Sequence, residues 1–488
     1  MTVGELVNAT GGKLIFGCEK TEITSFEINS RCVKKGSCFV GVEGERTDGN
    51  LYIHDAINNG ATVILSEKEM QCGVLAEVKN KGSELAFVLT DNVYNAITKA
   101  AIYFRDRYIN NVVAVTGSVG KTTVKELIYY VLSENMFFSK TEGNKNNHLG
   151  LPLTLLSSGK AKNIVCELGI SKKKEMALLS KISKPCVSVI TNVGVAHAEY
   201  FGSRETTAQE KLKIISEMPP SGRIIINGDE PLLTENRYLS EKEKKGNIEV
   251  IKVSSVNEKS DYFVYNTRYK DGGTFFDIKK QGVCYLKELF VPIYGLHGAF
   301  DAAFAVACAD IFDLSEESIR MGLKKYIPCG DRQRLIEKNG YYILLDCYNA
   351  SPESFKASLD AYKNIKKEKG VKTSCIVAGS MLELGKISEA EHAKLGQIIA
   401  SSSPDVLITV GREASIICDE AEKNGMSREN VYSFLSEYDA GKSVETEEND
   451  DIFAINAASV IKKRLPSGAL IMIKGSRALK LERIAKYL

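Results

Sequence analysis

The chain has 488 residues, 44% of them hydrophobic, and its 64 Lys and Arg residues nearly balance its 62 Asp and Glu residues. This length predicts about three domains at roughly 150 residues each. The net charge of +2 argues against a disordered chain and against a nucleic-acid-binding protein that relies on overall positive charge. No apolar run reaches the roughly 18 residues that predict a membrane span.

The 12 cysteines occur singly, without a CxxC pair, and no two of the five histidines have HxxxH spacing. These patterns exclude the usual zinc-ribbon and dithiol redox motifs. Residues 1–5 do not resemble the start of a secretory signal, so we expect reduced thiols in a cytoplasmic protein. We also expect a monomer.

The first part of the chain, residues 1–92, predicts a small α/β domain. Short strands are expected at 39–42 and 61–65, with a short helix at 53–58 between them. A polar stretch at Asp91-Asn92 then leads into a helical pattern over 96–106.

Residues 93–328 predict a doubly wound α/β domain. Helical patterns separate most of its β-branched runs, which is typical of parallel strands buried on both faces. These runs lie at 111–115, 163–166, 187–191 and 223–226.

Residues 329–488 predict a smaller, Rossmann-like domain, in which helices again separate short apolar runs. Strands are expected at 341–345, 373–377, 406–410 and 469–473. The acidic stretch 445–451 is expected to be a solvated loop or the start of a helix. The predicted fold class is therefore α/β with three domains.

The sharpest local motif fills 112–123, where a strand-like run leads into Gly117-Ser-Val-Gly-Lys-Thr-Thr123 and then a helical pattern. Glycines there let backbone N–H groups turn toward phosphate oxygens, and the helix N-terminus adds positive potential. Lys121 is placed to reach the β- and γ-phosphates, and the Thr122 hydroxyl to bind Mg²⁺. A full P-loop pattern has Gly at position 115, where this chain has Val. The residues expected to bind ATP or GTP are Gly117, Ser118, Gly120, Lys121, Thr122 and Thr123.

A P-loop alone leaves kinase, GTPase, motor protein and ligase open. Together with Thr141-Glu-Gly-Asn-Lys-Asn-Asn147, Glu167-Leu-Gly169 and Thr191-Asn-Val-Gly-Val-Ala-His197, however, it resembles the Mur ligases. These ATP-dependent enzymes add amino acids to the peptidoglycan precursor, and the resemblance extends over the whole chain. The stretches 146–156, 346–352, 381–385 and 474–477 resemble the branch that joins D-alanyl-D-alanine to a UDP-linked muramoyl tripeptide.

The resemblance implies a role for each domain. Residues 1–92 would bind the UDP-linked substrate, residues 93–328 would bind ATP, and residues 329–488 would close on ATP and bind the incoming amine. ATP would phosphorylate the terminal carboxylate of the tripeptide, and the amine of the dipeptide would displace phosphate from the acyl phosphate. Bringing two anions together requires positive charge, so positioning and electrostatics would carry the catalysis.

The resemblance also implies catalytic and metal-binding residues. Lys121 would stabilise the transferring phosphoryl group, while Thr122 and Glu167 would bind one Mg²⁺. His197 would bind a second metal ion beside Lys211, which in the family is carbamylated by CO₂. Lys213 is the neighbouring alternative for that modification.

Further residues are assigned to substrates by the same resemblance. Arg332 would contact the phosphates of ATP and Asp346 its ribose. The residues expected at the substrates are Ser30, Arg31, Asp48, Asn144 and Asn147. Asn349, Lys474 and Ser476 are expected either at the acceptor dipeptide or in the contacts that close the C-terminal domain.

Four positions after residue 92 depart from the usual family pattern. Gly298, Asp301 and Ser351 stand where Asn is usual, and Ser380 stands where Asp is usual. A second hypothesis is therefore an amide synthetase of a specialised pathway that joins a different carboxylate to a different amine. A third is a nucleotide-binding scaffold protein without turnover.

Overall fold

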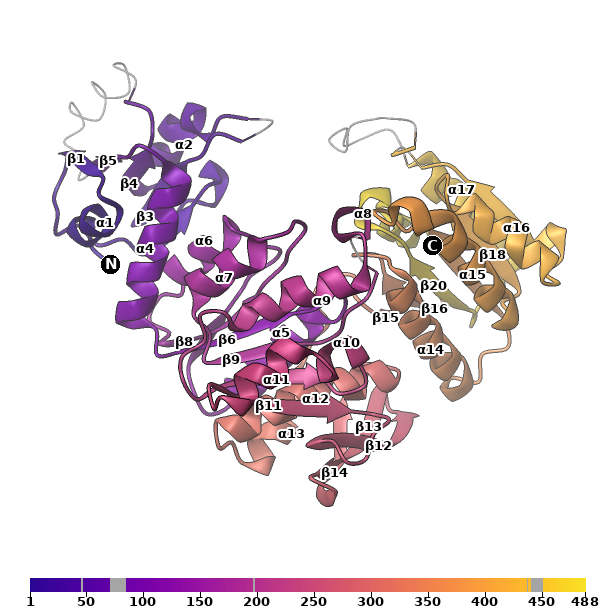
Figure 1. The fold of residues 1–488 in the computed structure, drawn as a ribbon. Helices are drawn as coiled ribbons and strands as arrows, with labels where there is room; N and C mark the ends of the chain where they lie inside the picture. Colours follow the sequence, from indigo (N-terminus) through magenta and orange to yellow (C-terminus); the bar gives the residue numbers. More distant parts are fainter. Residues whose placement is uncertain (45–46, 71–84, 196–197, 437, 440–450) are drawn as a thin grey trace.

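The computed structural model describes residues 1–44, 47–70, 85–195, 198–436, 438–439 and 451–488. These residues form three α/β lobes in chain order, each with its own sheet (Figure 1). The central lobe lies between the N-terminal and C-terminal lobes (Figure 1). The predicted fold class is confirmed.

The N-terminal lobe has, in the described residues, the strand order β1-β5-β4-β3-β2. Its elements are α1 (Val3–Thr10), β1 (Lys13–Phe16), β2 (Ser25–Glu27), β3 (Ser37–Gly41), α2 (Ile53–Asn58), β4 (Ala61–Ser66) and β5 (Ala86–Leu89). Only the β1–β5 pair is antiparallel among these neighbours. Strand β3 is buried along its whole length, as expected for an inner parallel strand. The predicted strands and helix of this lobe are present.

Helix α4 (Val93–Tyr108) leads from the N-terminal lobe into the central lobe. The Asn92 side chain caps it by accepting a hydrogen bond from the N–H of Asn95. Its apolar face, which includes Ile97, packs against both α1 and α6 (Gly150–Leu156) and forms one continuous core with them. The division expected at residue 92 therefore coincides with the start of a helix that both lobes share.

The central sheet has the strand order β14-β13-β12-β11-β10-β9-β6-β8-β7 over the described part of the chain. Its strands are β6 (Asn111–Thr116), β7 (Phe138–Lys140), β8 (Asn163–Glu167), β9 (Val187–Ile190), β10 (Gly222–Asn227), β11 (Ile248–Ser254), β12 (Tyr262–Lys270), β13 (Gly273–Lys280) and β14 (Val283–Val291). The strands from β7 to β12 run parallel, with β6 between β8 and β9. The carboxyl ends of β6, β8 and β9 therefore meet at one edge of the sheet.

Strands β12, β13 and β14 extend this sheet as an antiparallel meander, which the sequence analysis did not predict. The remaining helices of the lobe are α5 (Lys121–Leu132), α7 (Glu175–Ser183), α8 (Ala198–Phe201), α9 (Arg204–Leu212), α10 (Pro231–Thr234), α11 (Arg237–Lys244), α12 (Leu296–Ile311) and α13 (Glu316–Lys325). Helix α12 is buried from Ala302 to Ala309 and packs against α5 and the sheet. A helix that is apolar all round has to lie inside a lobe.

The C-terminal lobe has the strand order β15-β16-β20-β17-β18-β19 within the described residues. Its elements are β15 (Arg334–Lys338), β16 (Tyr341–Asp346), α14 (Pro352–Glu368), β17 (Ser374–Gly379), α15 (Ser388–Ser401), β18 (Val406–Val410), α16 (Ser415–Lys423), β19 (Val431–Phe434), α17 (Ile452–Arg464), β20 (Leu470–Lys474) and α18 (Ile484–Tyr487). The four predicted strands are confirmed as β16, β17, β18 and β20. All but 451 of the acidic stretch 445–451 lies outside the described residues.

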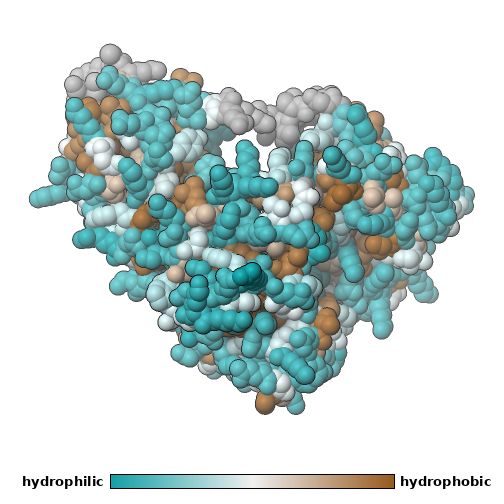
Figure 2. Space-filling model, in the orientation of Figure 1, coloured by the Kyte–Doolittle hydropathy of each residue, from teal (hydrophilic) through white to brown (hydrophobic). Residues whose placement is uncertain are grey.

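Hydrophilic side chains cover most of the face shown in Figure 2, with hydrophobic residues scattered among them. In the described parts of the chain, no helix is both long and apolar enough to cross a bilayer.

Candidate active site

The P-loop connects β6 to α5 at the carboxyl edge of the central sheet. Gly117 lies so close to the next strand end that an added Cβ would be 1.9 Å from the Thr191 hydroxyl oxygen. Gly120 has a φ of +82°, a left-handed conformation that glycine adopts without strain, and it caps α5. The first turn of α5 therefore points its free N–H groups at the loop.

Lys121 and Thr122 follow directly in the first turn of α5. The Lys121 ammonium donates to the carbonyls of Gly117 at 2.9 Å and Ser118 at 3.2 Å. The Thr122 hydroxyl donates to Oε2 of Glu167 at 2.7 Å, because Glu167 ends the neighbouring strand β8. The Nδ2 group of Asn146 donates a hydrogen bond to the other carboxylate oxygen of Glu167, Oε1, at 2.8 Å.

This hydroxyl–carboxylate pair has the chemistry of a site for a hard cation. Mg²⁺ prefers oxygen ligands and is usually bound through one or two carboxylates together with substrate phosphates. Thr122 and Glu167 supply such oxygens at the floor of the P-loop, and Glu167 is only 4% exposed. Within the described residues no group of three His, Cys, Asp or Glu side chains is placed to hold a metal ion, and His197 lies outside those residues.

Lys211 comes from α9 and lies beneath the P-loop. Its amine donates to the Gly117 carbonyl at 2.8 Å, and the residue is 3% exposed. Burial, and then the charge of Lys121, hold the pKa of Lys211 well below its usual range. Lys213, the neighbouring alternative, instead forms an ion pair with Glu210 at 2.6 Å, and its side chain is 40% exposed.

A cleft of about 530 Å³ runs from the P-loop to the C-terminal lobe. Most of the residues predicted to bind ATP or metal line it, together with several predicted substrate residues. Those predicted residues are Ser118, Gly120, Lys121, Thr122, Thr123, Asn147, Glu167, Arg332, Asp346, Asn349 and Lys474. Tertiary packing thus brings together residues from both lobes that lie up to 356 positions apart, from Ser118 to Lys474.

The C-terminal wall of the cleft contains a buried ion pair. Lys474 is 1% exposed and donates to Oδ2 of Asp346 at 2.6 Å and to the Asn349 carbonyl at 3.1 Å. Asp346 also accepts from the Ser358 hydroxyl at 2.5 Å. Asp346 is therefore held rigidly at the end of β16. The guanidinium of Arg332 lies 3.4 Å from the ring centroid of Tyr348, a cation–π contact.

The other predicted residues lie elsewhere. Arg31 is exposed and Ser30 buried in the N-terminal lobe, and Asp48 there is ion-paired with Lys68 at 2.7 Å, which lowers the pKa of Asp48. Asn144 is exposed in the central lobe. Ser476 accepts from the Leu382 N–H in the C-terminal lobe.

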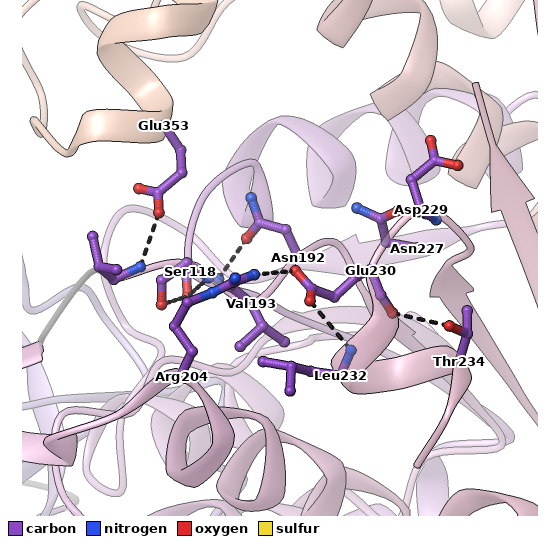
Figure 3. A network of polar contacts seen from close by, with 12 residues as sticks. Ser118, Asn192, Val193, Arg204, Asn227, Asp229, Glu230, Leu232, Thr234 and Glu353 are labelled. Atoms are coloured by element: carbon purple, nitrogen blue, oxygen red, sulfur yellow. Dashed lines mark hydrogen bonds and ion pairs between the residues drawn. The ribbon is translucent and has the colours of Figure 1, made fainter. Parts of the chain in front are cut away.

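Among the cleft residues that were not assigned a role from the sequence, three make contacts that shape the site. Oδ1 of Asn192 accepts hydrogen bonds from the N–H groups of Ser118 and Val119, both at 2.9 Å. Figure 3 shows Asn192 beside Ser118. Asn146 orients Glu167, and Glu353 reaches the central lobe from α14. Asn146 and Asn192 lie inside the quoted motifs, but their partners are far away in sequence.

The structure accounts for three of the four departures from the family pattern. A Cβ at Gly298 would lie 2.8 Å from the side chain of Ile293, so a larger residue does not fit there. The Ser351 hydroxyl accepts from the N–H of Ser354 and caps α14, which Asn would also do. Ser380 is fully buried and accepts from the Ala414 N–H.

Asp301, the fourth departure, lines the cleft beside the P-loop. A Cβ on Gly120 would be 3.1 Å from the Asp301 carboxylate. Burial raises the pKa of Asp301 to about 8, so the group is mostly protonated at neutral pH. A protonated carboxyl donates and accepts hydrogen bonds much as the Asn amide does.

The fold and the site define a three-lobed α/β protein with a P-loop facing an interlobe cleft. Three family models match in succession: Mur ligase family, catalytic domain, at 22–107; Mur ligase middle domain at 115–309; and Mur ligase, glutamate ligase domain, at 331–477.

Relatives match over almost the whole chain. The UDP-N-acetylmuramoyl-tripeptide–D-alanyl-D-alanine ligase of Bacillus subtilis is 33% identical over 96% of this chain and 94% of its own length. The crystal structure of MurF from Acinetobacter baumannii has a TM-score of 0.81 at 26% identity, covering 100% of this chain and 98% of that one. MurF ligase from Thermotoga maritima in complex with ADP has a TM-score of 0.75 at 26% identity, covering 96% and 97%. The chain belongs to the Mur ligase family.

Proposed function

We propose that this chain is an ATP-dependent ligase that adds D-alanyl-D-alanine to UDP-N-acetylmuramoyl-tripeptide in peptidoglycan precursor synthesis. The observation that carries the proposal is the cleft that joins the P-loop to Arg332, Asp346 and Lys474 of the C-terminal lobe. The similarity to the Bacillus subtilis ligase over 96% of the chain supports the choice of substrates.

The first chemical step transfers the γ-phosphoryl group of ATP to the tripeptide carboxylate. A carboxylate oxygen forms a bond to phosphorus, the bond to the ADP oxygen breaks, and an acyl phosphate results. The dipeptide amine then attacks the acyl carbon, loses a proton and expels phosphate. Lys121 and the N-terminus of α5 offset the negative charge that meets at the γ-phosphate.

Thr122 and Glu167 are proposed to hold one Mg²⁺, and His197 is proposed as a ligand of a second. Mg²⁺ bound there would supply positive charge that offsets the negative charge of the ATP phosphates. Asn146 keeps the Glu167 carboxylate facing Thr122, because it occupies the other carboxylate oxygen.

Lys211 is proposed to carry a carbamate. Its lowered pKa favours the neutral amine, whose lone pair can form a bond to the carbon of CO₂ with release of one proton. The product is an anion next to Lys121, which removes the repulsion between two buried amines. This change of charge supports the modification at Lys211 and not at Lys213, which is ion-paired with Glu210.

The proposed domains are residues 1–92, 93–328 and 329–488. The residues proposed to bind substrates are divided among these three domains. Arg332 and Asp346 would hold the phosphates and ribose of ATP. The proposed substrate residues are Ser30, Arg31 and Asp48 for the UDP end, Asn144 and Asn147 in the central lobe, and Asn349, Lys474 and Ser476 for the dipeptide. We propose a cytoplasmic monomer.

The experiment mixes purified protein with ATP, Mg²⁺, UDP-N-acetylmuramoyl-tripeptide and D-alanyl-D-alanine, and follows phosphate release and product mass. We expect the pentapeptide product only when both substrates are present, and none with the Lys121→Ala variant. Absence of product from protein that still binds ATP would reject this activity and favour a ligase for another carboxylate and amine.

A further inference from the structure

Glu353, in the first turn of α14, crosses the cleft from the C-terminal lobe to the central lobe (Figure 3). Its Oε1 accepts a hydrogen bond from the backbone N–H of Val195 at 2.9 Å, across 158 positions of sequence. Ser351 caps the same helix and Pro352 begins it, so the carboxylate projects from a firmly held helix start.

The approach of Glu353 depends on a glycine in the central lobe. A Cβ at Gly194 would lie 2.7 Å from the Oε1 atom of Glu353 and 2.8 Å from its Cδ atom. Any side chain there would push the carboxylate away. The contact is therefore a close fit between the two lobes and not a loose encounter of exposed side chains.

The loop that Glu353 contacts, residues 191–195, is hydrogen-bonded to the P-loop. The Gly194 N–H donates to the Ser118 hydroxyl oxygen at 2.9 Å. Asn192, two residues earlier, accepts from the N–H groups of Ser118 and Val119. These are P-loop N–H groups of the kind that bind phosphate, so the position of loop 191–195 determines how they are presented.

A further contact fixes this loop from the side of α9. Arg204 donates to the Val193 carbonyl at 2.8 Å and forms an ion pair with Glu230 at 2.7 Å (Figure 3). Glu230 is only 7% exposed and caps α10 through the Leu232 N–H. Within the central lobe the loop is therefore supported on both sides, and Glu353 adds a support that depends on where the C-terminal lobe lies.

The second oxygen of Glu353 is not used in this contact. Oε2 is buried and has no hydrogen-bond partner among the described residues. A buried carboxylate oxygen without a partner loses its hydration, and this loss offsets part of the favourable bond to Val195. When the lobes separate, water can solvate both oxygens, which offsets part of the bond to Val195 that is lost.

We propose that Glu353 is a positioning residue that couples the placement of the C-terminal lobe to the conformation of the P-loop. With the lobes together, the carboxylate holds Val195 and keeps loop 191–195 against Ser118 and Val119. With the lobes apart, the loop loses this support. The inference rests on the proposed ligase function for its kinetic consequence, although the coupling itself is a property of the fold.

The test compares the full-length protein with its Glu353→Ala and Glu353→Gln variants. Glutamine keeps an oxygen that can accept from Val195, whereas alanine removes it. Glu389→Ala is the matched control, because Glu389 is an exposed first-turn carboxylate of α15 in the same lobe. Hydrogen exchange by mass spectrometry is measured on peptides covering 117–119 and 190–195, together with kcat and KM for ATP.

We expect Glu353→Ala to speed exchange in both peptides and to lower kcat about tenfold while KM for ATP changes less than about twofold. Glu353→Gln should restore most of the protection from exchange and most of kcat. Glu389→Ala should match the unaltered protein in both measurements. Unchanged exchange at 117–119 in a folded Ala variant would overturn the coupling. So would a raised KM with unchanged kcat, which would assign Glu353 to nucleotide binding. Exchange tests the coupling even if the unaltered protein shows no ligation, an outcome that would count only against the proposed function.

Discussion

Lys121 and Lys211 donate to the same acceptor, the carbonyl oxygen of Gly117, from 2.9 Å and 2.8 Å. One lysine comes from the helix after the P-loop and the other from α9, 90 positions later. Two ammonium groups this close repel each other, and burial removes the water that would screen them. Burial lowers the pKa of both amines, and the charge of Lys121 lowers that of Lys211 further. A carbamate on Lys211 would turn this repulsion into attraction.

Removing the Lys211 side chain tests that arrangement. We expect Lys211→Ala to lower kcat at least about 10²-fold, because the anion proposed beside Lys121 is lost. Acetate should restore part of the activity by supplying a carboxylate in the vacated space. The measurement is phosphate release at increasing acetate concentration.

Lys213→Ala is the control for the preceding variant, since Lys213 pairs with Glu210 and its side chain is 40% exposed. It should keep nearly full activity. If Lys213→Ala were the inactive variant rescued by acetate, the modification would belong to Lys213.

Asn146 should govern the requirement for Mg²⁺ although it is not a proposed ligand. Its Nδ2 donates to Glu167 at 2.8 Å and leaves the other carboxylate oxygen facing Thr122. We expect Asn146→Ala to raise the Mg²⁺ concentration for half-maximal phosphate release about 10- to 100-fold. The exposed Asn247→Ala is the control. An unchanged Mg²⁺ requirement would contradict the orienting role.

Asp301 should make stability depend on pH. Burial raises its pKa to about 8 in the folded protein, against about 3.9 in an unfolded chain. Between these values the folded state binds the extra proton, so the free energy of unfolding falls as pH rises, by up to about 1.4 kcal/mol per pH unit. Asp301→Asn removes this contribution, and the variant should gain stability relative to the unaltered protein as pH rises toward 8.

Urea unfolding at several pH values measures this difference, with the exposed Asp419→Asn as control. Equal slopes in the Asp301→Asn variant and the unaltered protein would refute the assignment. Above pH 8 the ionised carboxylate beside Gly120 should also repel phosphate and raise KM for ATP in the unaltered protein alone.

The ion pair of Asp346 and Lys474 should be important for the stability of the C-terminal lobe. Lys474→Ala would leave a carboxylate buried without its cation and should cost about 3–5 kcal/mol. Replacing both, as Asp346→Asn with Lys474→Met, should cost less, since no charge stays buried. Thermal unfolding compares these variants with Lys463→Ala, an exposed lysine of α17. A double variant as unstable as the single one would contradict this account.

Much of the fold was predictable because its buried parallel strands are continuous apolar runs. The run at 341–345 became β16, and Val406–Val410 became β18 with the same bounds. The meander β12 to β14 was missed because its strands mix aromatic, charged and polar residues. Along Tyr262–Lys270, burial changes from complete at one end to alternating at the other. Over its whole length, such a strand matches neither the continuous apolar run of a fully buried strand nor the strict alternation of a half-buried one.

The sequence by itself determined the P-loop, since strand, glycine turn and helix start are adjacent in the chain and their geometry follows from local backbone preferences. It also determined the order of the three lobes through the spacing of buried runs. Only the tertiary structure decided which side chains meet in the cleft. Lys211 reaches Gly117 across 94 positions, Lys474 reaches Asp346 across 128, and Glu353 reaches Val195 across 158. Contacts at such separations depend on how helices and sheets pack, because no local propensity specifies a partner so far along the chain.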